Sequence, residues 1–204
     1  MRTSPLLADH DSVFEIRIHG RGGQGVVTAA ELLSVAAFTE GSNALAFPTF
    51  GSERTGAPVT SFCRISDRPI RSREPIVEPD ALIVQDPTLL HQVDVFSGAG
   101  ADAYVLINTG RTLDELGLGD LVDRFRVERL VTVPASELAR EHLGRPLPNA
   151  ALLGGFAALT GVVSIDSVAG AIRRRFAAAT GEGNVAAALA AYTAVREGAE
   201  VAHA

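Results

Sequence analysis

The feature that most constrains the fold is GRGGQG (20–25), four glycines within six residues that separate a strand-like from a helix-like segment. Residues 13–20 alternate apolar and polar side chains, which predicts a strand. From residue 26 the apolar residues recur at helical spacing, which predicts a helix over about 25–40 that Gly41 ends. A strand, a glycine loop and a helix in this order are typical of the first unit of an α/β domain.

The rest of the chain continues this alternation. Short apolar runs predict strands at 43–47, 59–66, 80–86, 103–108 and 127–134. We expect the 59–66 strand to form a hairpin with the stretch near Ile70. Helices are expected at 88–96, 116–123, 136–144, 149–160, 164–176 and 184–200, with Ser136 and Ser164 as N-caps. The pattern predicts an α/β fold: a three-layer Rossmann-like domain with a mostly parallel sheet and a helical C-terminal third.

The length and composition are typical of one globular domain. The chain has 204 residues, of which 47% are hydrophobic, so we expect a single domain over 13–200 after a flexible N-terminus at 1–12. The net charge of −6 argues against a nucleic-acid binder. No apolar run reaches the length of a membrane span, and the first residues lack the apolar core of a signal peptide, so we expect a cytoplasmic protein.

Two residue types limit the chemistry of the chain. All 18 basic residues are Arg, which excludes Schiff-base and pyridoxal chemistry and a Walker lysine. Cys63 is the single cysteine, so there is no thiolate set for an iron–sulfur cluster or a cysteine zinc site. Its place in an apolar strand predicts a buried small side chain rather than a nucleophile. We therefore expect any redox centre to lie on another chain.

The glycine loop has the composition of a phosphate-binding loop. Gly20, Gly22 and Gly25 fit the pattern G-x-G-x-x-G after a predicted strand and before a predicted helix. Without Cβ atoms the backbone can approach a phosphate, and the free N–H groups and positive dipole end of the helix favour an anion. Gln24 would add a side-chain donor and Thr28 a hydroxyl. The alternative is a tight turn whose glycines only permit close packing of helix on sheet.

A dinucleotide such as NAD fits this loop less well. The acidic residue that binds the ribose should lie about 20 residues further on, near the end of the second strand. There the sequence reads NALAF (43–47) and then Pro48, without a carboxylate. The sequence therefore favours a phosphate cradle over a site for a dinucleotide ribose.

A second polar, glycine-rich segment, FGSERTGAPV (50–59), is long for a connection, and such loops often carry function. Anion contacts are expected from Ser52, Arg54 and Thr55, with Glu53 placed to pair with Arg54. Asp86, which ends the predicted strand 80–86, either faces the same site at the carboxyl edge of the sheet or caps the following helix.

Together, GRGGQG, FGSERTGAPV and EPDALIVQD (78–86) resemble the gamma subunit of the 2-oxoacid:ferredoxin oxidoreductases, of which pyruvate:ferredoxin oxidoreductase is the best-known member. The resemblance runs from about Phe14 to Gly198 and includes PNAALLGGFAAL (148–159) and GEGNVAAALAAY (181–192). Thr55 stands where the family often has Arg or Gly, and Asn149, which leads the later helix, is equally suited to be a helix cap. The residues that match the family's motifs are Gly22, Gly23, Gln24, Gly25, Glu53, Arg54, Gly56 and Asn149.

The resemblance implies a subunit of a multi-subunit enzyme that oxidatively decarboxylates a 2-oxoacid to an acyl-CoA and passes the electrons to ferredoxin or a similar acceptor. Thiamine diphosphate, Mg and iron–sulfur clusters are then expected on the partners, which are alpha, beta and ferredoxin-like subunits. The gamma chain is expected to bind coenzyme A, whose pyrophosphate and 3′-phosphate suit the two loops, and to bridge the assembly. None of its residues is expected to be a catalyst, since His19 has no orienting neighbour in the sequence.

Two other functions remain open from the sequence. A purely structural subunit of such a complex would pack the glycine loop against a partner and bind no ligand. A free-standing nucleotide-binding oxidoreductase, such as an NAD dehydrogenase, would bind NADH tightly. The small-residue helices at 149–160 and 184–194 suit every one of these functions, because Ala and Gly let neighbouring backbones approach closely.

Overall fold

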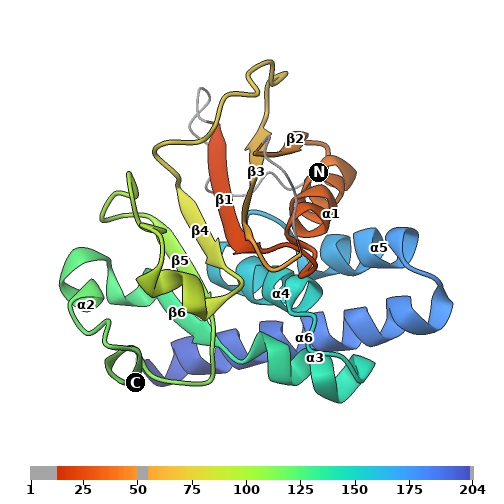
Figure 1. The fold of residues 1–204 in the computed structure, drawn as a ribbon. Coiled ribbons are helices and arrows are strands. Elements are labelled where there is room, and N and C mark those ends of the chain that lie inside the picture. The colour runs from red at the N-terminus through yellow and green to blue at the C-terminus, as the bar shows by residue number, and fades with distance from the viewer. Residues whose placement is uncertain (1–12, 50–54, 203–204) are drawn as a thin grey trace.

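The computed structural model describes residues 13–49 and 55–202, and its centre is a six-stranded sheet (Figure 1). The sheet order is β2-β3-β1-β4-β5-β6, in which β1, β4, β5 and β6 run parallel and β3 is antiparallel to both of its neighbours. The predicted α/β fold with a mostly parallel sheet is confirmed. The strands are β1 (Phe14–Arg21), β2 (Asn43–Pro48), β3 (Pro58–Ser66), β4 (Ala81–Val84), β5 (Tyr104–Asn108) and β6 (Leu130–Val133).

The predicted hairpin between 59–66 and the stretch near Ile70 is wrong. β3 pairs along its length with β1, from Phe14 opposite Ile65 to Arg21 opposite Pro58, and its other edge pairs with β2. Because both hydrogen-bonding edges of β3 are occupied, no edge is left for residues 67–80, which form no strand.

Long helices cover one face of the sheet, and the main core lies between them and the strands (Figure 1). On this face β1 buries Ile16 and Ile18 completely, together with Leu33 of the first helix and Phe156 of the fourth. Cys63 is fully buried in the same core, as predicted, and burial raises the pKa of its thiol. These helices are α1 (Val26–Thr39), α3 (Ala135–Leu143), α4 (Asn149–Thr160), α5 (Ile165–Arg175) and α6 (Ala178–Ala202).

The small-residue helices α4 and α6 pack against each other. A Cβ on Gly154 would fall inside contact distance of the backbone carbonyl of Ala188, so the two backbones approach more closely than any larger residue would permit. A Cβ on Gly155 would lie 3.3 Å from Leu106 of β5. The small residues at 149–160 and 184–194 are therefore used inside the chain.

Short elements cover the other face, where a second core contains Leu82, Val105, Phe96 and Phe125. The predicted helix at 88–96 is only a short 3₁₀ turn, because the carbonyls of Val95 and Ser97 accept hydrogen bonds from Arg17 instead of continuing a helix. The segment predicted as a helix at 116–123 is divided between two elements. The short elements are η2 (Pro87–His91), η3 (Asp114–Leu116), α2 (Leu121–Arg124) and η4 (Val127–Arg129).

The helix ends follow local chemistry with one exception. Gly41 turns the chain after α1 with a φ of 91°, and the Ser164 hydroxyl caps α5 by accepting from the Ser167 amide at 3.1 Å. Ser136 is not the cap of α3, because Pro134 occupies that position and Asn108, at the end of β5, accepts from the Ser136 amide at 3.0 Å. Within the described part of the chain, no helix has both the length and the apolar character needed to cross a bilayer.

Candidate functional site

The glycine loop lies at the carboxyl edge of the parallel strands, between the end of β1 and the start of α1. Gly23 and Gly25 have φ angles of 93° and 75°, in the left-handed region where a Cβ is disfavoured. Gly25 occupies the N-cap position, so no side chain caps the helix, and its first turn contains no acidic residue. The first amides of α1 are therefore uncapped donors at a positive dipole end, which is where an anion binds well.

A cavity of about 340 Å³ opens over these amides. It is lined by the loop and the first turn of the helix, and Val59 of β3 closes one side. Thr28 lies in this lining, as its predicted role as a hydroxyl donor requires. The lining residues are Arg21, Gly22, Gly23, Gly25, Val26, Val27, Thr28 and Val59.

The second glycine-rich segment meets the first loop directly. The Gly22 amide donates to the Ala57 carbonyl at 2.9 Å, and the Gly56 amide donates to the Gly22 carbonyl at 3.0 Å. Thr55 forms a short parallel bridge with Gly22. The structure thus brings Thr55 and Gly56 to the glycine loop, whereas the predicted contacts of Ser52, Glu53 and Arg54 lie outside the described residues.

Gln24 is tied into the protein rather than presented to a ligand. Its Oε1 accepts from the Arg21 amide at 2.8 Å, and its Nε2 donates to Asp86 Oδ2 at 2.7 Å. Its backbone carbonyl accepts from Gln85 Nε2 at 2.5 Å. The expected free donor is therefore not available, because the Gln24 side chain connects the glycine loop to the end of β4.

Asp86 fills both of the roles considered from the sequence. Its Oδ1 caps η2 by accepting from the Thr88 amide at 2.9 Å, and its Oδ2 receives Gln24. Burial alone would raise the pKa of Asp86, but the hydrogen bonds from Thr88 and Gln24 and the charge of Arg21 outweigh burial and hold this pKa below its usual value. Asp86 is therefore an ionised anchor beneath the loop.

Arg21 is a site residue that the motif analysis missed. Its Nε lies 3.2 Å from Asp86 Oδ2, its Nη1 donates to the Gly56 carbonyl at 3.0 Å, and its Nη2 donates to Gln92 Oε1 at 2.7 Å. One guanidinium thus joins the glycine loop, the second loop and η2. The signal was present in the sequence, since Arg21 is the one charged residue inside GRGGQG.

Asn149 reaches the glycine loop from the far side of the molecule. Pro148 holds the N-cap position of α4, so Asn149 is the first helical residue and not a cap. Its side chain lies against the loop, because a Cβ on Gly25 would be only 2.6 Å from Asn149 Nδ2. Asn149 is 6% exposed, and no described residue forms a hydrogen bond with its carboxamide.

His19 lies on β1 just before the loop and is held by Arg17. The Arg17 Nε donates to His19 Nε2 at 3.0 Å, and Arg17 also donates to the carbonyls of Ile76, Val95 and Ser97. Burial, and secondarily the Arg17 charge, lower the pKa of His19 to about 4, so the imidazole is neutral near pH 7. Because Nε2 already accepts a hydrogen bond in a buried place, His19 does not act as a base on a ligand in the loop.

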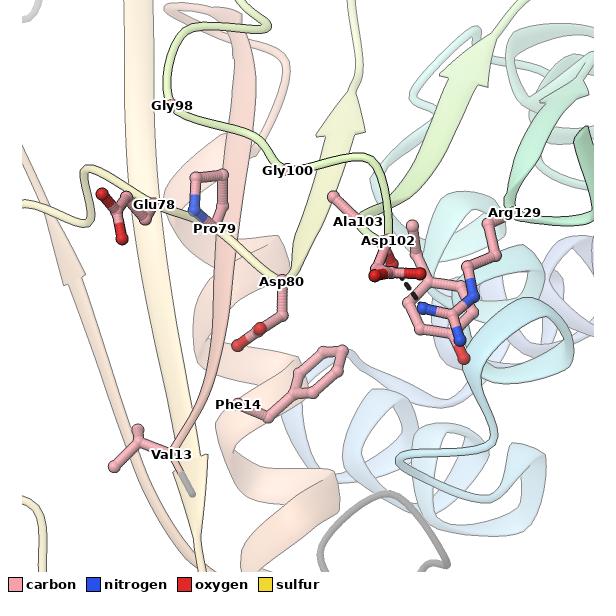
Figure 2. Close-up of a pocket in the computed structure, with 11 residues that line it drawn as sticks. Val13, Phe14, Glu78, Pro79, Asp80, Gly98, Gly100, Asp102, Ala103 and Arg129 are labelled. Carbon is pink, nitrogen blue, oxygen red and sulfur yellow. Dashed lines mark hydrogen bonds between the residues drawn. The ribbon is translucent and has the colours of Figure 1, made fainter. Parts of the chain in front are cut away.

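The largest cavity, of about 580 Å³, lies at the other edge of the sheet, at the amino ends of β1, β4 and β5 (Figure 2). Figure 2 shows Phe14 and Asp80 at these strand starts and Arg129 beside Asp102. None of the predicted site residues lines it, and ligands of parallel sheets bind at the carboxyl ends of the strands. We therefore assign the candidate site to the glycine loop despite its smaller cavity. The described residues contain no group of His, Cys, Asp and Glu side chains arranged to hold a metal ion.

The geometry agrees with the comparisons with known proteins. The model of the family described as "Pyruvate ferredoxin/flavodoxin oxidoreductase" matches residues 15–194. The chain belongs to this family. The predicted resemblance is confirmed, and the matched region contains both glycine-rich loops, Asp86 and Asn149.

Relatives of this family chain are gamma-type subunits. The pyruvate/ketoisovalerate oxidoreductases common subunit gamma of Pyrococcus abyssi is 48% identical over 180 residues, which are 88% of this chain and 96% of the relative. Pyruvate synthase subunit PorC of Methanothermobacter marburgensis is 47% identical over 180 residues, with the same coverage. The crystal structure of pyruvate oxidoreductase subunit PORC from Thermotoga maritima matches with a TM-score of 0.76 and 31% identity, over 90% of this chain and 97% of that one. Within its family the chain is therefore of the gamma type.

Proposed function

We propose that the chain is the gamma subunit of a cytoplasmic 2-oxoacid:ferredoxin oxidoreductase that converts a 2-oxoacid to an acyl-CoA. The relatives that support this proposal carry pyruvate or ketoisovalerate in their names and match along almost their whole length. Residues 13–200 would act as one domain, bridging alpha, beta and ferredoxin-like subunits. Those partners would carry thiamine diphosphate, Mg and the iron–sulfur clusters and would pass electrons to ferredoxin or a similar acceptor.

The contribution of this chain would be to bind coenzyme A. The observation that carries this part is the uncapped start of α1 behind Gly23 and Gly25, with a cavity of about 340 Å³ directly over it. A pyrophosphate fits this place because it needs several N–H donors, no acidic neighbour and no Cβ in its way. The first turn of α1 meets all three needs.

The residues divide the work between binding and support. The amides of Val26, Val27 and Thr28 would donate to phosphate oxygens, and the Thr28 hydroxyl would add a further donor. Arg21 and Asp86 would hold the loop in shape through Gln24 and Gly56. Bound coenzyme A would supply the thiol that accepts the acyl group, while the chemical steps on the 2-oxoacid would take place on the partners.

The purified complex provides the test of this proposal. We expect 2-oxoacid-dependent reduction of ferredoxin by the complex and no turnover by the chain alone. In a complex carrying Gly23→Ala, the KM for coenzyme A should rise about tenfold with kcat nearly unchanged, since the loss is one of binding. A matched control is Gly117→Ala, which has the same positive φ far from the loop.

Two results would contradict the proposal. Turnover by the isolated chain would indicate a free-standing enzyme. A Gly23→Ala complex with an unchanged KM for coenzyme A would favour a purely structural subunit, in which the glycines lie against protein.

A further inference from the structure

A second cavity, of about 400 Å³, lies beside the glycine loop. It is formed by the end of α3, the connection 144–149 and the start of α6. Asn149 belongs to its lining and also contacts the glycine loop at Gly25. One side chain therefore separates the phosphate cradle from this cavity.

The polar groups of the cavity are buried and not fully used. Asn149, 6% exposed, has no hydrogen-bond partner among the described residues. Asn184 is 4% exposed, and its Nδ2 donates to the Thr180 carbonyl at 2.8 Å, while its Oδ1 receives no hydrogen bond from the described part of the chain. Buried amides normally find partners, so two incompletely bonded carboxamides in one cavity indicate a polar ligand.

The remaining lining is flat and apolar, with positive charge at the rim. Phe176 presents a ring, and Leu147 adds an aliphatic side chain. Arg145 and His142 stand exposed at the opening. Carboxamides that donate and accept, an aromatic ring and a cation at the mouth together suit a heteroaromatic base attached to a phosphate.

We propose that this cavity binds the purine base of a nucleotide whose pyrophosphate lies on the glycine loop. Asn149 contacts both parts, Asn184 and Phe176 hold the base, and Arg145 faces the ribose or its phosphate. The inference rests on the proposed coenzyme A function and deepens it, because the adenosine part of that ligand is assigned to a place of its own.

Calorimetric titrations of the full chain with pyrophosphate, ADP and coenzyme A test the inference. We expect ADP to bind at least about tenfold more tightly than pyrophosphate, because the base adds contacts. Asn184→Ala and Phe176→Leu should each remove most of this gain and leave the pyrophosphate affinity unchanged. Phe176→Leu keeps an apolar side chain, so it remains informative if Asn184→Ala disturbs the start of α6.

The control variant is Arg196→Ala, an exposed residue about 18 Å along α6 from Asn184, and it should change nothing. Equal affinities for pyrophosphate and ADP would overturn the base site and leave the phosphate cradle standing. A gain from the base that survives both variants would also overturn it. Absence of binding by all three compounds would remove the cradle and the base site together.

Discussion

Two pairs of glycines show how differently the same residue is used in this molecule. In the glycine loop, Gly23 and Gly25 have positive φ, and a Cβ on Gly23 would meet only a methyl carbon of Thr55 at 3.9 Å. In α4, Gly154 has no room for a Cβ because the backbone of α6 lies against it. The first pair leaves space for a ligand, whereas Gly154 and Gly155 leave space for neighbouring parts of the chain.

The two regions are also held together differently. The loop depends on polar ties, from Gln24 and Arg21 to Asp86 and from Arg17 to His19. The α4–α6 contact belongs to the main apolar core. Substitutions in α4 should therefore act on stability alone, while those in the loop should respond to pH and alter binding.

The largest effect is expected at the helix contact. Gly154→Val should lower the free energy of unfolding by about 3 kcal/mol or more, because the side chain overlaps the α6 backbone. Chemical denaturation measures this change. The matched control is Gly170→Ala in α5, where nothing lies within 4 Å of the new Cβ and a gain of about 0.5–1 kcal/mol is expected. A well-folded Gly154→Val protein of unchanged stability would show that the two backbones are not in close contact.

The next effect concerns pH and the support beneath the loop. The pKa of His19 is about 4 in the folded chain and about 6.5 in the unfolded chain, so between these values the unfolded state binds more protons. Stability should therefore fall as the pH falls through this window, by up to about 3 kcal/mol for this residue. His19→Gln keeps an acceptor for Arg17 and should remove that part of the decline, whereas His91→Gln, at an exposed position, should not. Identical pH curves for wild type and His19→Gln would contradict the buried, neutral histidine.

A smaller effect is expected where the loop meets α4. Gly25→Ala combines a left-handed backbone with a contact of 2.6 Å to Asn149 and should cost about 2 kcal/mol. Adding Asn149→Ala should recover about 1 kcal/mol, since the clash disappears and the backbone strain remains. Gly117→Ala, with a φ of 69° and open space around it, measures the strain alone. Strict additivity of the two changes would show that Asn149 does not contact the loop.

Local sequence patterns predicted the elements well and their long-range contacts less well. The strand, loop and helix at 13–40 follow from spacing within one stretch, and α4 and α5 follow from the same kind of pattern. The position of β3 between β1 and β2 did not follow, because strand pairing depends on partners distant in the sequence.

The same limit applies to the candidate site. Glycine, Thr28 and Asp86 carry recognisable signals, but the attachment of Gln24 to Asp86 and the approach of Asn149 to Gly25 depend on how three separate segments pack. Helix 88–96 failed for a related reason, since its carbonyls serve the buried Arg17. Residue type therefore indicated which groups belong to the site, and only the fold shows which of them are free to meet a ligand.

The most direct test of the phosphate cradle is a calorimetric titration of coenzyme A into the wild-type chain, Gly23→Val and Gly117→Val. Both variants carry the same kind of backbone strain, but only Gly23→Val places a side chain in the cavity over the first turn of α1. We predict binding by wild type and Gly117→Val, and a loss of at least about tenfold for Gly23→Val. Equal binding by all three proteins, or no binding by the wild type, would contradict the account and show that the loop does not receive the phosphates.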